Sequence, residues 1–148
     1  WPWVKPLNLF NLILSSPSEQ HFWRTSSFDN CKAILYWEGI KTDNCFCNGT
    51  SIAERYITLP FDWKKAKISF KACTGKAGDD FVVAIFKIKA TNESTHYYLI
   101  PSNSCISESI EVLLPKNHTI KIVLGTKIFE SCDEEWVIWK NIKLEKES

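Results

Sequence analysis

Residues 65–72 read Lys-Ala-Lys-Ile-Ser-Phe-Lys-Ala, an unbroken alternation of polar and apolar side chains. Successive side chains of an extended strand point to opposite faces, so the apolar side chains from Ala66 to Ala72 share one face. The lysines and Ser69 share the other face. This pattern is typical of an antiparallel strand that has one face on a core and the other in solvent.

The same kind of pattern, bounded by turn residues, recurs along the chain. Residues 119–124 and 136–144 also alternate, and residues 81–88 are apolar on both faces, which predicts a central strand covered on each side. Weaker strands are expected at 7–14, 33–37, 55–59, 96–100 and 110–114. Turn-forming residues lie between the strands, at 60–62, 75–80, 91–94, 101–103 and 115–117. About nine strands without crossover helices predict an all-β fold, a two-sheet antiparallel β-sandwich.

Composition indicates a single domain spanning residues 1–148, with 45% apolar and 24% charged residues. The 18 Lys and Arg nearly balance the 17 Asp and Glu, so no long-range attraction to nucleic acid or anionic lipid is expected. No apolar run approaches the roughly 20 residues that span a bilayer, and we expect no membrane insertion. The chain begins with Trp1 rather than Met, which favours a processed chain.

Cysteines and glycosylation sequons favour an oxidising, extracellular compartment. The six cysteines are Cys31, Cys45, Cys47, Cys73, Cys105 and Cys132, an even number that suits disulfides. Sequons begin at Asn48, Asn92 and Asn117, each in a polar, turn-like stretch. These features predict a disulfide-bonded glycoprotein that is secreted or lies on the outer face of the plasma membrane.

The disulfide pairing stays open, because six cysteines allow about 15 pairings. Cys45 and Cys47 are not expected to pair with each other, since one intervening residue strains the bond. Their spacing also differs from the usual zinc knuckle, and no histidine lies beside a cysteine. We therefore predict no zinc site.

The order of features narrows the type of sandwich. An apolar strand at 9–14 precedes Phe22-Trp23, and the cysteine-rich stretch is followed by Tyr-Ile-Thr-Leu-Pro at 56–60. The chain closes with Glu-Trp-Val-Ile-Trp-Lys-Asn-Ile-Lys-Leu at 135–144. This succession resembles the galactose-binding-like jelly roll of many carbohydrate-binding modules, discoidin-type domains and ephrin-receptor ligand-binding domains. The resemblance covers most of the chain and implies a jelly roll, but no position matches the family's metal-binding carboxylates.

A second sandwich family, the lipid-binding ML domains, provides an alternative. Residues 27–31, Ser-Phe-Asp-Asn-Cys, are similar to the opening of those domains. ML domains normally place a cysteine against the last strand, whereas residues 133–135 separate Cys132 from that strand here. Lipid binding is kept as an alternative to the jelly-roll interpretation.

Catalysis is not expected. No nucleophile elbow, phosphate-binding glycine loop or zinc-protease helix motif is present. The acidic doublets Asp79-Asp80 and Glu134-Glu135 are best interpreted as solvated turn charges, because adjacent strand residues point to opposite faces. Calcium binding at these doublets is a less favoured interpretation. We predict a binding protein without cofactor or metal.

Aromatic residues, 14% of the chain, are the strongest candidates for ligand contact. Tyr36, Trp37 and Phe46 lie near the cysteine-rich loop, and Trp63 follows a turn and precedes two lysines, so we expect it to be partly exposed. In the closing strand, Trp136 and Trp139 alternate in face, so one of them lies outside or both faces are covered.

The sequence is compatible with two main classes of function. We favour recognition of a protein partner, such as a receptor or surface protein, because the stretch from Cys31 to Cys47 has the character of a shaped, disulfide-held binding loop. The alternative is a lectin-like module that binds a glycan through an exposed aromatic side chain.

Overall fold

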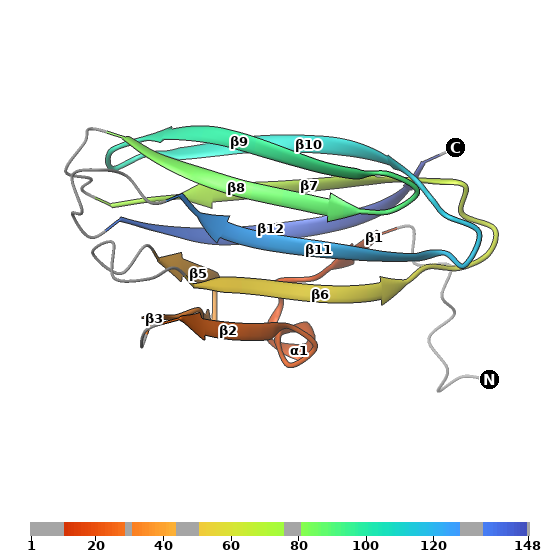
Figure 1. The fold of residues 1–148 in the computed structure, drawn as a ribbon, viewed down its shortest axis with the longest axis horizontal. Helices are drawn as coiled ribbons and strands as arrows, with labels where there is room; N and C mark the ends of the chain where they lie inside the picture. The colour runs from red at the N-terminus through yellow and green to blue at the C-terminus, as the bar shows by residue number, and fades with distance from the viewer. Residues whose placement is uncertain (1–10, 29–30, 44–50, 76–80, 128–134, 148) are drawn as a thin grey trace.

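The computed structural model of the chain describes residues 11–28, 31–43, 51–75, 81–127 and 135–147. Two antiparallel sheets face each other in a sandwich (Figure 1). Sheet A contains β1 (Asn11–Ile13), β4 (Ile34–Tyr36), β5 (Gly39–Asp43), β7 (Lys65–Cys73), β10 (Cys105–Leu113) and β12 (Trp136–Glu147). Sheet B contains β2 (Arg24–Phe28), β3 (Cys31–Lys32), β6 (Ile52–Thr58), β8 (Phe81–Lys89), β9 (Glu93–Pro101) and β11 (Thr119–Thr126). The predicted fold class, a disulfide-bonded two-sheet sandwich, is confirmed.

The order of the strands places β12 near the middle of sheet A. The order is β10-β7-β12-β5-β4, and β1 pairs with β12 beyond the end of β5. Sheet B has the order β3-β2-β6-β11-β8-β9. A short helix, α1 (Pro17–Gln20), follows β1 and precedes β2. Within the described ranges, no helix has the length and apolar character to cross a membrane.

The core lies between the facing sides of the two sheets. The apolar residues of β7, which alternate with polar residues from Ala66 to Ala72, are buried as predicted. Phe70 of β7 stacks on Phe86 of β8 at 4.8 Å between ring centroids, and Trp139 of β12 packs against Phe70 at 5.2 Å. Aromatic rings from both sheets therefore fill the centre of the sandwich, where the lipid-binding alternative would need an open space.

A bulge in β12 changes which side chains face the core. Val137 and Trp139 are buried before it, whereas Ile142 and Leu144 are buried after it. The register with β7 shifts between Lys140 and Lys143, and Asn141 has a φ of 50°. One inserted residue reverses the alternation of the strand, so both halves of β12 present apolar side chains to the core.

Most of the predicted strands are confirmed, with some differences in extent. The structure adds β2, β3, β5 and α1, and it extends β11 through Gly125 to Thr126. The expectation that residues 81–88 are covered on both faces is only partly correct. Val82, Ala84 and Phe86 are buried, but Phe81 and Ile85 on the opposite face are half-buried.

One predicted disulfide lies within the described residues. Cys73 of β7 and Cys105 of β10 are directly paired in register, and their sulfur atoms are bonded. Side chains of the other four cysteines lie outside the part of the chain that the structure describes, as does Asn48. Asn92 and Asn117 are exposed, and glycosylation at these sites remains a prediction.

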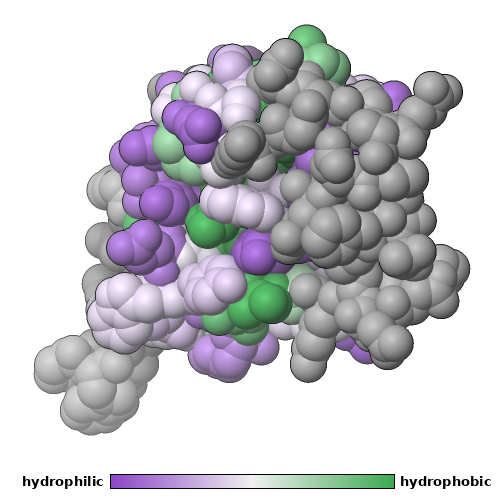
Figure 2. Space-filling view, turned by 90° about the vertical axis from the view of Figure 1, so that its left-hand side faces the viewer, coloured by the Kyte–Doolittle hydropathy of each residue, from purple (hydrophilic) through white to green (hydrophobic). Residues whose placement is uncertain are grey.

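Figure 2 shows the molecule along its long axis. In this view, hydrophilic side chains cover most of the described surface, and the hydrophobic areas between them are small and separated.

Candidate functional site

An aromatic depression lies on the outer face of sheet A, over β4, β5 and β12. It has a volume of about 490 Å³ and is lined by Tyr36, Trp37, Glu38, Lys41, Trp136 and Ile138, which we call the aromatic pocket. Trp37 is 81% exposed and Tyr36 is 41% exposed. Two of the four residues predicted to contact a ligand, Tyr36 and Trp37, therefore lie together in one depression.

Strand register explains why Trp136 and Ile138 join these residues. In β12 the odd-numbered residues Val137 and Trp139 face the core, so Trp136 and Ile138 face outward. Ile138 pairs with Lys41 of β5, which in turn pairs with Ile34 of β4. The alternation is visible in the sequence, but it does not assign Trp136 to the site, because alternation alone leaves the partner strands unknown.

Helix α1 holds the turn that presents Trp37. The buried side-chain amide of Gln20 donates hydrogen bonds to the backbone carbonyl oxygens of Ser15, at 3.0 Å, and of Tyr36. The neighbouring Glu19 carboxylate lies 2.9 Å from the Arg55 guanidinium of β6. The helix is thus fixed to sheet B by an ion pair and to the β4–β5 turn by a buried amide.

Charged groups surround the aromatic rings. The Lys41 ammonium lies 5.5 Å from the centroid of the Trp136 ring, a cation–π contact, and 3.9 Å from the Asp43 carboxylate. Glu38, which also lines the pocket, lies 3.4 Å from Lys140. The pocket therefore combines apolar ring faces with both donors and acceptors of hydrogen bonds, which suits a ligand that has apolar and hydroxyl-bearing surfaces.

Buried hydrogen bonds support the floor of the aromatic pocket. The Trp139 indole N–H donates to the Thr42 hydroxyl at 3.0 Å, and that hydroxyl lies 2.9 Å from the Thr126 hydroxyl of sheet B. The Thr74 hydroxyl donates to the backbone carbonyl of Trp136 at 2.6 Å. These contacts join the strands that position Trp136 and Lys41.

The other two predicted ligand-binding residues do not extend this site. Trp63 is 3% exposed and belongs to the hydrophobic core, so the expectation that it is partly exposed is wrong. Its backbone N–H donates to the carbonyl of Pro60 at 3.0 Å, which forms a tight turn, and Phe61 is the exposed aromatic of that turn. The predicted binding loop runs from Cys31 to Cys47, and its residues 44–47, including Phe46, lie outside the described residues.

Among the described residues, no group of three or more His, Cys, Asp or Glu side chains could hold a metal ion. The predicted acidic doublets at 79–80 and 134–135 lie outside the described ranges, except for Glu135. Glu135 is buried, so its interpretation as a solvated turn charge is wrong.

Gly39 allows the β4–β5 turn to approach β12 closely. A Cβ added at this position would lie inside van der Waals contact of the Trp139 carbonyl oxygen and 3.1 Å from its carbonyl carbon. We expect Gly39→Ala to lower the free energy of unfolding by about 1–3 kcal/mol, measured by chemical denaturation, because backbone must move. Gly125→Ala is the control, since its nearest neighbour would be 3.6 Å away. Equal stability of the two variants would contradict the close approach.

Comparisons with solved structures find the same fold. TmCBM61, solved in complex with β-1,4-galactotriose, is similar with a TM-score of 0.60 and 12% identity, over 92% of this chain and 97% of that one. The xylan-binding module CBM15 has a TM-score of 0.58 and 9% identity, over 84% and 90% of the two chains. The xylan-binding domain from CBM 22 has a TM-score of 0.53 and 9% identity, over 86% and 88%.

The sequence matches no protein-family model, and a search of curated proteins found no match. The similarity to these solved structures shows that the chain has the jelly-roll β-sandwich fold that occurs in carbohydrate-binding modules. The resemblance to galactose-binding-like jelly rolls is thus confirmed at the level of fold.

Proposed function

We propose that this chain is a non-catalytic carbohydrate-binding module that holds an oligosaccharide on the outer face of sheet A. The observation that carries the proposal is the aromatic pocket, in which the 81% exposed Trp37 lies beside Tyr36 and Trp136. Several aromatic side chains gathered around one depression are typical of a ligand-binding site, whereas single exposed aromatic residues are common on any protein surface.

The chemistry of the pocket suits a sugar ring. A pyranose has a face of C–H groups and a rim of hydroxyls, so it can cover an aromatic ring while its rim exchanges hydrogen bonds with charged groups. Glu38 can accept such hydrogen bonds and Lys41 can donate them. Both residues line the pocket together with the aromatic rings.

The structural neighbours support a glycan rather than the protein partner favoured from the sequence. The three solved structures above are named as galactotriose-bound or xylan-binding. An extracellular location is part of the proposal, and the Cys73–Cys105 disulfide supports it, because disulfides persist mainly in oxidising compartments.

Substitution of Trp37 tests the site. We expect Trp37→Ala to weaken oligosaccharide binding by about 10–100-fold, because truncating a central aromatic contact costs about 1.4–2.7 kcal/mol. Ligands are found first on a glycan array and then titrated by calorimetry against the whole chain. The matched control is Phe61→Ala, since Phe61 is 78% exposed but lies in the turn after β6, away from the pocket.

The two variants separate the possible results. Loss of binding in Trp37→Ala with retention in Phe61→Ala supports the proposed site. Equal binding by both variants would place the ligand elsewhere, and binding to no sugar on the array would contradict a carbohydrate function and return attention to a protein partner.

A further inference from the structure

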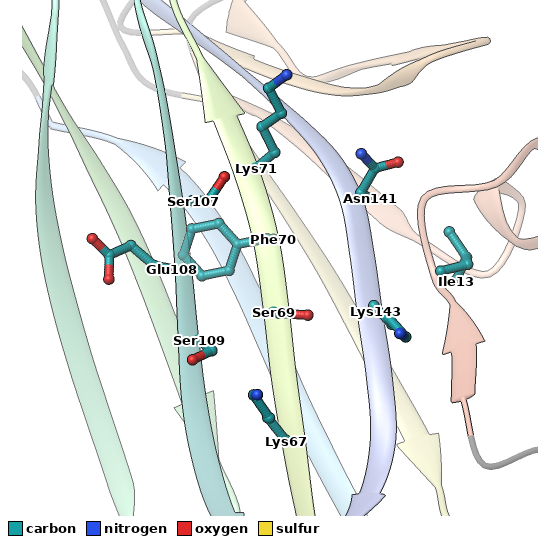
Figure 3. Close-up of a pocket in the computed structure, with 10 residues that line it drawn as sticks. All are labelled: Ile13, Lys67, Ser69, Phe70, Lys71, Ser107, Glu108, Ser109, Asn141 and Lys143. Carbon is teal, nitrogen blue, oxygen red and sulfur yellow. The ribbon is translucent and has the colours of Figure 1, made fainter.

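A second depression lies on the outer face of sheet A, over β7, β10 and β12 (Figure 3). It has a volume of about 600 Å³. Its solvent-facing lysines and serines are Lys67, Ser69, Lys71, Ser107, Ser109 and Lys143. We call this depression the lysine–serine groove.

Strand register arranges these side chains in rows across three strands. Ser69 of β7 pairs with Ser109 of β10 on one side and with Lys143 of β12 on the other. Lys71 pairs in the same way with Ser107 and Lys140. Neighbouring strands lie about 4.8 Å apart, so each row places serine and lysine residues on one face with their backbones at that spacing.

The groove is positively charged although the chain as a whole has a net charge of only +1. Lys71 forms no ion pair with any residue in the described ranges. Lys143 lies 3.7 Å from Glu145, which neutralises part of its charge. The one carboxylate among the lining residues, that of Glu108, points away from β7 and β12 in Figure 3.

Carboxylates at the far end of β12 lie near Lys67 rather than Lys71. Burial and the neighbouring Glu111 carboxylate raise the pKa of Glu147, while Lys67 and Lys65 act in the opposite direction. Lys67 therefore has an acidic neighbour already. Lys71 and Lys143 are the better probes of the groove, since one is unpaired among described residues and the other is only partly neutralised.

A third depression, of about 450 Å³, joins the groove to the aromatic pocket. It shares Trp37 and Glu38 with the aromatic pocket, and it shares Ile13 and Asn141 with the lysine–serine groove. The two sites are therefore parts of one continuous surface across sheet A. From β4 to β10 that surface crosses five strands, about 19 Å at ordinary strand spacing, which is longer than a single sugar ring.

We propose that the ligand is an acidic oligosaccharide, an inference that rests on the proposed carbohydrate function. A sugar ring stacks in the aromatic pocket, and a carboxylate or sulfate substituent further along the chain lies against Lys71 and Lys143 in the lysine–serine groove. Serine hydroxyls of the same rows bond the neutral hydroxyls of that sugar unit.

Charge complementarity favours this ligand over a neutral one. A neutral oligosaccharide lying in the groove would displace water from ammonium groups without supplying a counter-charge, which is unfavourable. An anionic substituent accepts charge-assisted hydrogen bonds from the same groups, and these are stronger than neutral ones. The aromatic pocket in turn favours a sugar over an acidic peptide that is bound by charge alone.

Calorimetric titration of the whole chain with matched oligosaccharides tests the proposal. The probes are neutral galactan, carboxylated oligogalacturonate and sulfated galactan oligosaccharides of equal length, with polyglutamate as a polyanion that contains no sugar. We expect at least one acidic oligosaccharide to bind about 10-fold more tightly than neutral galactan, with the difference shrinking between about 0.05 and 0.5 M salt.

The lysine variants locate the effect. Lys71→Gln/Lys143→Gln is expected to weaken acidic binding about 10-fold and to leave neutral binding unchanged. The control Lys89→Gln/Lys116→Gln removes the same net charge from exposed positions on β8 and in the turn before β11, and should change acidic binding less than about 2-fold.

Other results would overturn the inference in distinguishable ways. Equal binding of neutral and acidic oligosaccharides, unaffected by the lysine variant, would refute the acidic ligand and leave the carbohydrate function standing. Polyglutamate binding as tight as that of the acidic sugars would show that the groove binds charge alone. Binding of no oligosaccharide would refute both proposals.

Discussion

Trp139→Ala is expected to lower the free energy of unfolding by about 3–5 kcal/mol, the largest effect of any single substitution that we predict. Trp139 is fully buried, and its ring packs against Phe70 at 5.2 Å and Phe86 at 6.1 Å. Truncation would leave a cavity between the two sheets. It would also remove the N–H that donates to Thr42, whose hydroxyl contacts Thr126 across the sandwich.

Chemical denaturation followed by circular dichroism would measure this loss. Trp139→Phe keeps an aromatic ring but removes the indole N–H, so it should cost less than the alanine variant and report on the hydrogen bond to Thr42. Trp37→Ala is the matched control, because Trp37 is largely exposed and its loss should change stability by less than about 0.5 kcal/mol. A loss below about 1 kcal/mol in Trp139→Ala would contradict its central place in the core.

Removing the Cys73–Cys105 disulfide is expected to cost about 2–4 kcal/mol. The bond closes a loop with a sequence separation of 32, and it constrains the unfolded chain by an amount that grows slowly with loop length. It also attaches β10, an edge strand of sheet A, to β7. The double substitution Cys73→Ala/Cys105→Ala removes this bond selectively, whereas a reducing agent would act on every disulfide in the chain.

The matched control lies on the same two strands and the same face. Ser69 and Ser109 are paired in register, so Ser69→Ala/Ser109→Ala changes a cross-strand pair without changing the covalent connectivity. We expect that control to change the free energy of unfolding by less than about 1 kcal/mol. Equal stability of the cysteine variant and the parent would contradict a stabilising role for the bond, and amide exchange in β10 would show whether the edge strand opens locally.

In β7, the local sequence pattern correctly predicts which side chains face the core, whereas in β12 it does so only in part. The face of β7 was predicted correctly, because alternation follows from the geometry of a strand and needs no knowledge of its neighbours. The bulge at Asn141 in β12 was not predicted, since residues 136–144 read as an unbroken strand. A single inserted residue reverses which side chains face the core, and packing of Ile142 and Leu144 selects that reversal.

Trp63 illustrates a local pattern that misleads. Its polar neighbours Asp62 and Lys64 favour exposure, yet the turn at Pro60 directs Trp63 into the core and leaves Phe61 in solvent. Neighbouring aromatic residues in a turn point in different directions, and their backbone conformation decides which of them is buried.

Local periodicity and residue type were enough to predict the all-β class, the sandwich, the inner face of β7 and the candidacy of Tyr36 and Trp37. Tertiary structure was needed to bring Trp136 beside Trp37 and to align Lys71 with Ser107 and Lys140. Strand order and register join positions far apart in the sequence, and long-range packing of the whole core selects that order and register. A binding face made from several strands is therefore a property of the folded molecule.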